Sequence, residues 1–207
     1  MSLRDWINPK YLEEKEVLNL NEKFKFAKNF CHLSIEDFFI KEKLLLVEKS
    51  LKLETYYKES SDLYEFLRTI DFKNSKNKVI VEFRKFLLSE EFIVFLEKIT
   101  SLKFMRNKID MHSLKLENTN YLLCHDDRVE MRKLAFVINF SDFEQRDGGA
   151  LEFFKMNTNT FEGEVFESII PKFSKFNIFE VCDKSYHQIT EVVSKKERVT
   201  IGGWYHG

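Results

Sequence analysis

Glycine and proline are scarce in this sequence, with 6 and 2 residues among 207, so flexible linkers and long irregular loops are not expected. The three cysteines, Cys31, Cys124 and Cys182, lie far apart and form no CxxC pair. This spacing suggests neither a disulfide framework nor a zinc ribbon. We therefore expect a reducing compartment, the cytoplasm, with the nucleus as the alternative.

The sequence also lacks a long apolar run and an excess of charge of either sign. No stretch approaches the roughly 20 apolar residues of a membrane-spanning helix, and the N-terminal MSLRDWINPKYLEEKE has no apolar signal-peptide core, so no membrane partner is expected. Lysine plus arginine (33) nearly balances aspartate plus glutamate (34). A nucleic-acid partner would need a local basic patch, and nucleic acid is not expected as a direct substrate.

Apolar residues make up 43% of the chain, which is enough for the core of one domain over residues 1–207. A change of hydrophobic period near residue 100 divides this domain. Residues 1–100 are predicted to be mainly helical support, with helical spacing in 41–54 and 79–100 and with Ser89 as the N-cap of a short helix. Ahead of these helices, residues 24–39 alternate well enough to form one or two strands.

Residues 101–207 are expected to form the barrel core. Short β-like runs follow one another there, several of them separated by breaks such as DGG. The runs are 104–116, 121–125, 133–140, 150–156, 168–181, 187–193 and 198–207. This pattern predicts a sandwich or jelly roll, and thus a mainly β domain of the α+β class with helical support.

The stretch YLLCHDDRVE, residues 121–130, places a histidine and two aspartates at the end of an apolar strand. If side chains alternate along this strand, His125 and Asp127 face the same side. Two histidines and one carboxylate on one face hold a divalent metal and leave positions open, the arrangement that non-haem iron(II) uses. Among the remaining histidines, His187 at the start of HQITEVV is the candidate third ligand.

Two neighbours of these residues leave alternatives open. Asp126 is either a carboxylate that faces solvent or supports the ligands, or an alternative ligand, and strand alternation favours Asp127 as the ligand. Cys124, next to a histidine, suggests a nucleophile, but alternation points the two side chains apart. We therefore interpret Cys124 as a small buried apolar residue.

Arg198 opens the apolar strand RVTIGGW, where a cation is costly to bury without an anion. A guanidinium fork suits a carboxylate in bidentate geometry. Thr200 lies two residues on, hence on the same face, and can add a hydroxyl to the same carboxylate. The alternative is an ion pair between Arg198 and a protein acid such as Glu180.

Several stretches in combination resemble the 2-oxoglutarate and iron(II)-dependent dioxygenases of the prolyl-hydroxylase type. They are HDD (125–127), DGGALEFF (147–154), IIPKFSKFNIFEV (169–181), YHQITEV (186–192) and RVTIGGWYHG (198–207). More narrowly, they resemble the branch that hydroxylates a proline of a small-subunit ribosomal protein in yeast and animals. ESSDLYEF (59–66) and FRKFLLSEEFIVFLEKIT (83–100) resemble the helical part of that catalytic domain, so the resemblance covers nearly the whole chain.

This resemblance implies a double-stranded β-helix of the jelly-roll or cupin-like kind, braced by the N-terminal helices. It implies that His125, Asp127 and His187 bind iron. It also implies that Arg198, with Thr200 beside it, holds the distal carboxylate of 2-oxoglutarate. The implied cofactor is Fe(2+), with 2-oxoglutarate and O2 as cosubstrates and ascorbate as a further candidate. The implied reaction releases succinate and CO2 and hydroxylates a carbon of a protein or peptide substrate of ribosomal origin.

The chain departs from that branch at two positions that usually hold a tyrosine near 2-oxoglutarate. One lies on the strand before the iron motif and is Leu116, and the other lies on the strand after it and is Asn139. Asn139 can still form a hydrogen bond to the cosubstrate, whereas Leu116 cannot. The affinity for 2-oxoglutarate is therefore the property that these departures put in question.

Candidate substrate contacts are Arg146, in the EQRDGG loop predicted near the barrel mouth, and Trp204, for which a place in the core or at the barrel rim is the alternative. Nucleic-acid demethylases of the superfamily usually carry a second arginine six residues after the cosubstrate arginine, where this chain has Trp204. Halogenases replace the carboxylate ligand by a small residue, and Asp127 is present.

The chief hypothesis is therefore hydroxylation of a peptidyl side chain, with a proline of a ribosomal or translation protein as the first candidate. The alternatives are a small-molecule hydroxylase, for example of amino acids, and a non-catalytic jelly roll that binds a protein partner.

Overall fold

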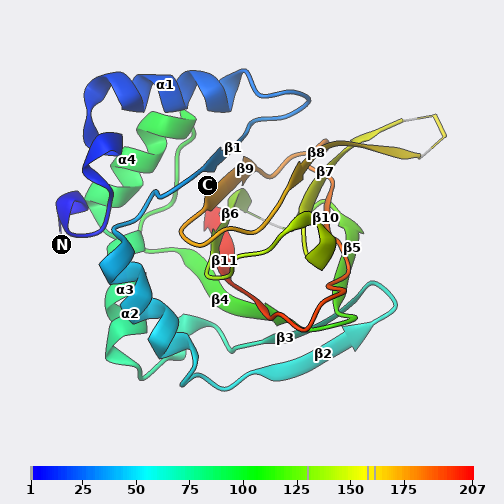
Figure 1. The fold of residues 1–207 in the computed structure, drawn as a ribbon. Helices are drawn as coiled ribbons and strands as arrows, with labels where there is room; N and C mark the ends of the chain where they lie inside the picture. The colour runs from blue at the N-terminus through cyan, green and yellow to red at the C-terminus, as the bar shows by residue number, and fades with distance from the viewer. Residues whose placement is uncertain (1, 130, 158, 161) are drawn as a thin grey trace.

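An antiparallel sheet curls around a central space, and the helices cover one side of it (Figure 1). The computed structural model describes residues 2–129, 131–157, 159–160 and 162–207. Within these residues the α-helices are α1 (Glu14–Lys25), α2 (Lys41–Leu51), α3 (Lys78–Leu87) and α4 (Glu90–Thr100). Short 3-10 helices are η1 (Leu3–Asp5), η2 (Pro9–Leu12), η3 (Phe72–Asn74) and η4 (Gln145–Asp147).

The sheet has eleven strands in the described part of the chain. They are β1 (His32–Ile35), β2 (Tyr57–Ser61), β3 (Tyr64–Arg68), β4 (Ile109–Leu116), β5 (Tyr121–His125), β6 (Arg132–Asn139), β7 (Leu151–Met156), β8 (Gly163–Ile169), β9 (Phe176–Glu180), β10 (His187–Ile189) and β11 (Arg198–His206). Their order is β1-β9-β6-β11-β4-β3-β5-β10-β7-β8, with β2 paired to β3. Sequence neighbours are mostly not neighbours in the sheet, so long-range pairing builds this fold.

Strand β3 joins the two halves of the sheet. Leu67 and Arg68 at its C-terminal end pair with β4, whereas Tyr64 and Glu65 at its N-terminal end pair with β5. One half, β1-β9-β6-β11-β4, lies against the helices, and the other half is β5-β10-β7-β8. The central space between the two halves holds the candidate site.

An aromatic core fixes the helices to the first half of the sheet. Apolar residues at helical spacing in α3 and α4, such as Ile80 and Phe83, are fully buried. The ring of Phe83 lies 4.9 Å from that of Trp6, and Phe38 stacks on Phe176 of β9 at 4.8 Å. On β11 the Tyr205 hydroxyl donates to the Leu87 carbonyl at 3.0 Å. The helices therefore hold one face of β11 and leave its other face to the central space.

The structure confirms the predicted mainly β class with helical support, and helices lie at 41–51, 78–87 and 90–100. Ser89 is an N-cap, since its hydroxyl accepts from the Phe92 amide at 3.3 Å. Each of the seven β-like runs beyond residue 100 overlaps at least one strand. In residues 24–39 there is one strand, β1, while Phe24 belongs to α1, a helix that the sequence pattern did not predict.

The assignment of residues 59–66 to the helical part is wrong, because they belong to the β2–β3 hairpin. Cross-strand ion pairs join its strands, between Lys58 and Glu65 and between Arg68 and Glu59, both at 2.7 Å. The pairing of β3 with β4 and β5 then outweighs the local preference of a polar sequence.

No helix in the described part of the chain combines the length and the apolar character that a membrane span requires.

Replacing Phe83 by alanine tests the aromatic core. The side chain is fully buried, so the cavity left behind should lower the free energy of unfolding by about 3–5 kcal/mol. Phe26, which is 84% exposed, is the matched control, and Phe26→Ala should change stability by less than about 0.5 kcal/mol. Urea denaturation followed by circular dichroism measures both. Equal effects of the two substitutions would contradict the assigned core.

Candidate metal centre

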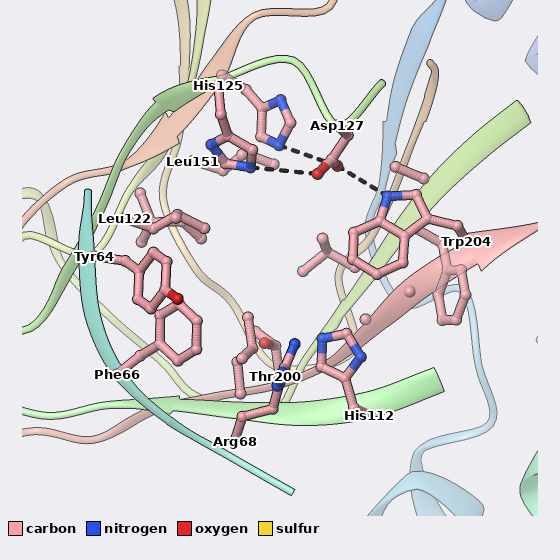
Figure 2. A pocket seen from close by; sticks show the side chains of 18 of the residues that line it. Tyr64, Phe66, Arg68, His112, Leu122, His125, Asp127, Leu151, Thr200 and Trp204 are labelled. Atoms are coloured by element: carbon pink, nitrogen blue, oxygen red, sulfur yellow. Dashed lines mark hydrogen bonds and ion pairs between the residues drawn. The ribbon is translucent and has the colours of Figure 1, made fainter. Parts of the chain in front are cut away.

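Three ligand-type side chains meet at the inner side of β5 and β10. His125 ends β5, His187 begins β10, and these two residues face each other in the antiparallel register with their rings 4.2 Å apart. The Nε2 atoms of His125 and His187 each lie 3.4 Å from a different carboxylate oxygen of Asp127 (Figure 2). All three donors lie within 4.8 Å of one another, so they can share one cation.

Asp127 reaches this position through a turn. Strand β5 ends at His125, and Asp127 has a φ of +59°, in the left-handed region that aspartate tolerates better than most residues. The prediction that strand alternation extends to Asp127 is therefore wrong, although its side chain does lie beside His125. Asp126 is engaged elsewhere, since its carboxylate accepts from the Nε of Arg128 at 2.7 Å.

Cys124 is exposed, and the interpretation of it as a buried residue is wrong. It lies at the rim of the cavity beside Leu123, which is itself 44% exposed. The reason is that β5 forms part of the cavity mouth, where Cys124 and Leu123 face solvent instead of a second layer of the described residues.

The backbone aims both histidine rings. The Nδ1 of His125 lies 2.8 Å from the Leu123 carbonyl, and the Nδ1 of His187 lies 2.8 Å from the Ser185 carbonyl. Since a carbonyl can only accept, Nδ1 carries a proton in each ring, which leaves Nε2 directed at Asp127. This is the orientation that imidazole ligands of a metal require.

The electrostatics favour an ionised Asp127, whose side chain is only 9% exposed. Burial acts to raise the pKa of its carboxyl, but the hydrogen bonds and charges of His125 and His187 outweigh burial and hold it well below its usual range. For His125, burial opposes the charged form, but Asp127 outweighs it and the pKa is raised. A carboxylate must be deprotonated to bind a metal, so Asp127 is prepared for that role.

Trp204 on β11 fixes the orientation of the Asp127 carboxylate through a direct hydrogen bond. Its indole Nε1 donates to Asp127 Oδ2 at 2.9 Å, although the two residues lie 77 positions apart. The guanidinium of Arg132 lies over the Trp204 ring, 3.4 Å from the centroid, with its Nη1 3.9 Å from Asp127 Oδ1. Sequence patterns gave no signal for either contact, because Asp127, Arg132 and Trp204 come from different segments that only the fold brings together.

The same cavity, of about 360 Å3, extends to Arg198 on β11, whose side chain is 1% exposed. Its Nε donates to the Gly149 carbonyl at 2.8 Å, while Nη1 and Nη2 are buried without a hydrogen-bond partner in the described residues. Burial lowers the pKa of this guanidinium to about 10, so it remains charged at neutral pH.

The alternative that Arg198 pairs with Glu180 finds no support, since the described part of the chain contains no ion pair between Arg198 and any carboxylate. Thr200 lies two residues on, is also buried and lines the same cavity. A buried guanidinium with two unused donor nitrogens fits a ligand carboxylate. The residues present therefore fit both a metal ion and a carboxylate-containing ligand next to it.

Asn139 lies beside this region, because it pairs with Thr200 in the register of β6 and β11. Its side chain is buried, with Nδ2 donating to the Lys175 carbonyl at 3.3 Å and Oδ1 without a partner in the described residues. Leu116 pairs with Arg198 in the register of β4 and β11 and belongs to a small apolar cluster that includes Phe143. Both residues are thus close to the arginine, and the role of Asn139 in cosubstrate binding stays a prediction.

Arg146 lies outside the cavity. It is on the exposed η4 turn, where its Nε is 2.8 Å from a carboxylate oxygen of Glu144. Its role in substrate binding stays a prediction that this geometry does not support.

Comparison with known proteins gives a consistent result. The sequence profile of the 2OG-Fe(II) oxygenase superfamily matches residues 111–206. Prolyl 3-hydroxylase OGFOD1 of Mus musculus is 34% identical over 181 residues, which cover 86% of this chain and 33% of that protein. The chain thus spans about a third of the length of this curated relative.

Solved structures share the fold. A Pseudomonas putida prolyl-4-hydroxylase superposes with a TM-score of 0.68 at 13% identity, covering 92% of this chain and 98% of that one. A Trichoplax adhaerens prolyl hydroxylase in complex with a hypoxia inducible factor peptide fragment superposes with a TM-score of 0.70 at 12% identity, covering 93% and 91%. At these identities the likeness concerns the fold alone, and it agrees with the predicted double-stranded β-helix.

The Trp204–Asp127 hydrogen bond predicts a measurable effect on metal binding. Trp204→Phe keeps a ring beneath Arg132 but removes the N–H donor to Asp127. Affinity for a divalent metal should therefore fall roughly 10- to 100-fold, as is typical when a ligand loses its orienting partner. Anaerobic titration with cobalt(II), followed by its visible absorbance, measures the change. Arg146→Ala, outside the cavity, is the control and should leave the affinity unchanged, whereas an unaltered affinity in Trp204→Phe would refute the assigned role.

Proposed function

We propose that this chain, whose residues 111–206 match the profile of the 2OG-Fe(II) oxygenase superfamily, is an iron(II)- and 2-oxoglutarate-dependent dioxygenase that hydroxylates a peptidyl side chain. A proline of a ribosomal or translation protein is the first candidate for the substrate. The observation that carries the proposal is Arg198, a buried guanidinium without an anion in the same cavity as the His125, Asp127 and His187 cluster.

Each residue of the site has a distinct task in this proposal. His125, Asp127 and His187 hold iron(II) through two imidazole nitrogens and one carboxylate, which leaves positions open for other ligands. Arg198, with the Thr200 hydroxyl beside it, binds the distal carboxylate of 2-oxoglutarate. The bound metal and cosubstrate supply the oxidation itself, in which O2 is consumed, 2-oxoglutarate becomes succinate and CO2, and a substrate C–H becomes C–OH.

The cavity mouth supports a peptide substrate. The residues at its rim include the exposed apolar side chains of Leu63, at the tip of the β2–β3 hairpin, and of Leu123. Exposed apolar groups around an open cavity are typical of a surface that contacts a macromolecule. The similar mouse protein is a prolyl 3-hydroxylase, and the similar Trichoplax adhaerens structure contains a bound peptide fragment.

The same proposal includes two finer points. Ascorbate would keep the iron in its reduced state. The cytoplasm, or alternatively the nucleus, would be the compartment, and it would suit Cys31, Cys124 and Cys182, which are all free thiols in the structure.

Substitutions at two adjacent aspartates test the proposed activity. Protein supplied with iron(II), 2-oxoglutarate, O2 and a library of proline-containing peptides should form succinate, and mass spectrometry should find peptides that have gained one oxygen atom. Asp127→Ala should abolish both signals, because it removes a metal ligand. Asp126→Asn, in which the altered carboxylate pairs with Arg128, should retain them. Wild-type protein that binds iron but forms no succinate with any peptide would contradict the proposal.

The cosubstrate is tested separately through Arg198. Anaerobic titration of the iron-loaded protein with 2-oxoglutarate should produce the charge-transfer absorbance of the chelate. Arg198→Met leaves the distal carboxylate without its partner, so 2-oxoglutarate should bind less tightly by about 2 kcal/mol or more, which is roughly 30-fold. Arg198→Lys keeps the positive charge but lacks the two-pronged guanidinium, so its affinity for 2-oxoglutarate should lie between those of the wild type and Arg198→Met. Equal affinity in all three proteins would assign the arginine another role.

A further inference from the structure

A second cavity adjoins the metal cavity and shares part of its wall. Its volume is about 500 Å3, and the residues common to both cavities are Glu59, Arg68, His112 and Trp204. The second cavity continues away from the metal ligands along the β2–β3 hairpin and the start of β4. Its remaining lining residues are Tyr57, Thr69, Ile70, Asp71, Asp110 and Arg132. A ligand that is longer than one residue and enters the first cavity would therefore have the second cavity beside it.

His112 lies at the junction of the two cavities. Its side chain comes from β4, is 9% exposed and has no hydrogen bond within the described ranges of the chain. Figure 2 shows it on the wall opposite His125 and Asp127, between Arg68 and Trp204. The ring nitrogens of His112 are open to the cavities, so a ligand there can form hydrogen bonds with them in place of solvent.

The chemistry of this imidazole suits a peptide group. Burial, followed by the charges of Arg68 and Arg132, lowers the pKa of His112 to about 4, so the ring is neutral at physiological pH. A neutral imidazole has one donor and one acceptor nitrogen. A peptide group likewise has one N–H donor and one carbonyl acceptor, which makes the two complementary.

The charges of the second cavity favour a cation. Three carboxylates, of Glu59, Asp71 and Asp110, face two guanidinium groups, of Arg68 and Arg132. Glu59 and Arg68 neutralise each other at 2.7 Å. This leaves Asp71 and Asp110 as the carboxylates that have no lysine or arginine within ion-pair distance in the described residues.

The remaining contacts of these groups leave that excess in place. Arg132 lines the second cavity, but it is directed at Trp204, which both cavities share, and at Asp127 of the metal cavity. One oxygen of Asp110 lies 3.0 Å from His206 Nε2. The oxygens of Asp71 accept hydrogen bonds from the backbone N–H groups of Lys73 and Met111. None of these contacts is an ion pair between a lysine or arginine and Asp71 or Asp110.

The outer edge of the second cavity adds apolar surface. Tyr57 is 55% exposed and Ile70 is 52% exposed. A lysine or arginine side chain combines an apolar stem with a cationic head, so it can contact this edge and the carboxylates together. We define the basic-residue subsite as Tyr57, Ile70, Asp71 and Asp110.

We propose that the substrate is an extended peptide whose backbone passes His112 and whose residue flanking the oxidised one places a lysine or arginine side chain in the basic-residue subsite. This inference rests on the proposed function and adds the substrate class to it. An acidic flanking side chain would meet two carboxylates at the subsite, and a free amino acid would fill only the metal cavity.

The test uses peptides with a central proline and randomised flanking positions. Protein loaded with iron(II) and 2-oxoglutarate is mixed with the library under anaerobic conditions, and captured peptides are sequenced. Lysine or arginine should be enriched at a flanking position. Asp110→Asn should reduce that enrichment roughly two- to fivefold, the range expected for loss of one partly exposed charge pair. Glu13→Gln, at an exposed carboxylate outside both cavities, should leave the enrichment unchanged.

His112 gives an independent measurement. His112→Leu should weaken capture of all peptides whatever their flanking charge, while the charge-transfer titration with 2-oxoglutarate shows that the metal cavity is intact. His112→Asn keeps one donor and one acceptor and should restore part of the capture. A loss that Asn does not restore would assign His112 to packing and overturn its part of the inference.

The outcomes separate this inference from the proposed function. Captured peptides without a preference for basic residues, or with a preference that Asp110→Asn does not alter, overturn the inference and leave the oxygenase proposal standing. Captured basic peptides that gain no oxygen in air support the subsite and contradict the proposed reaction. Failure to capture any peptide, with normal 2-oxoglutarate binding, overturns a peptide substrate and with it the subsite.

Discussion

The alternation of side chains along β11 is the constraint on which both the core and the candidate site depend. Ile201 and Tyr205 enter the aromatic core under the helices, whereas Arg198, Thr200 and Trp204 line the cavity. The close approach of β11 to β4 requires glycine at position 203, because a Cβ on Gly203 would lie 1.8 Å from the Asp110 carbonyl oxygen. A shift of register by one residue would exchange core and site residues on this strand.

Buried charge explains how the site is prepared for its ligands. Asp127 is ionised and held by two imidazoles and an indole N–H, so its charge is compensated before a metal binds. Arg198 is buried with one neutral hydrogen bond, so part of its desolvation cost remains uncompensated. The stability of the rest of the fold offsets this unfavourable free energy, and a ligand carboxylate would compensate it by pairing with the guanidinium. The two ends of the cavity thus differ. The charge at the Asp127 end is compensated by neighbouring residues, whereas the charge at the Arg198 end favours binding of an anion.

The β2–β3 hairpin brings a polar segment into the wall of the cavity. It closes the space between the two halves of the sheet because β3 pairs with β4 at one end and with β5 at the other. This position also places Glu59 and Arg68 at the boundary of the two cavities. The part of the chain that departs most from the sequence-based expectation therefore lies next to the metal centre and contributes to the surface that a substrate would contact.

The sequence by itself determined the elements whose signals are local and the residues whose chemistry is unusual in their context. Helical spacing located α2, α3 and α4, the cap at Ser89 marked the start of α4, and the resemblance together with an arginine in an apolar strand singled out Arg198. The tertiary structure decided the rest. The left-handed turn at Asp127, the Trp204 indole 77 residues away, the strand character of 64–68 and the exposure of Cys124 all depend on which strands pair. Periodicity reports only the two faces of an element, whereas the partner that each face meets is set by long-range pairing, which no local pattern contains.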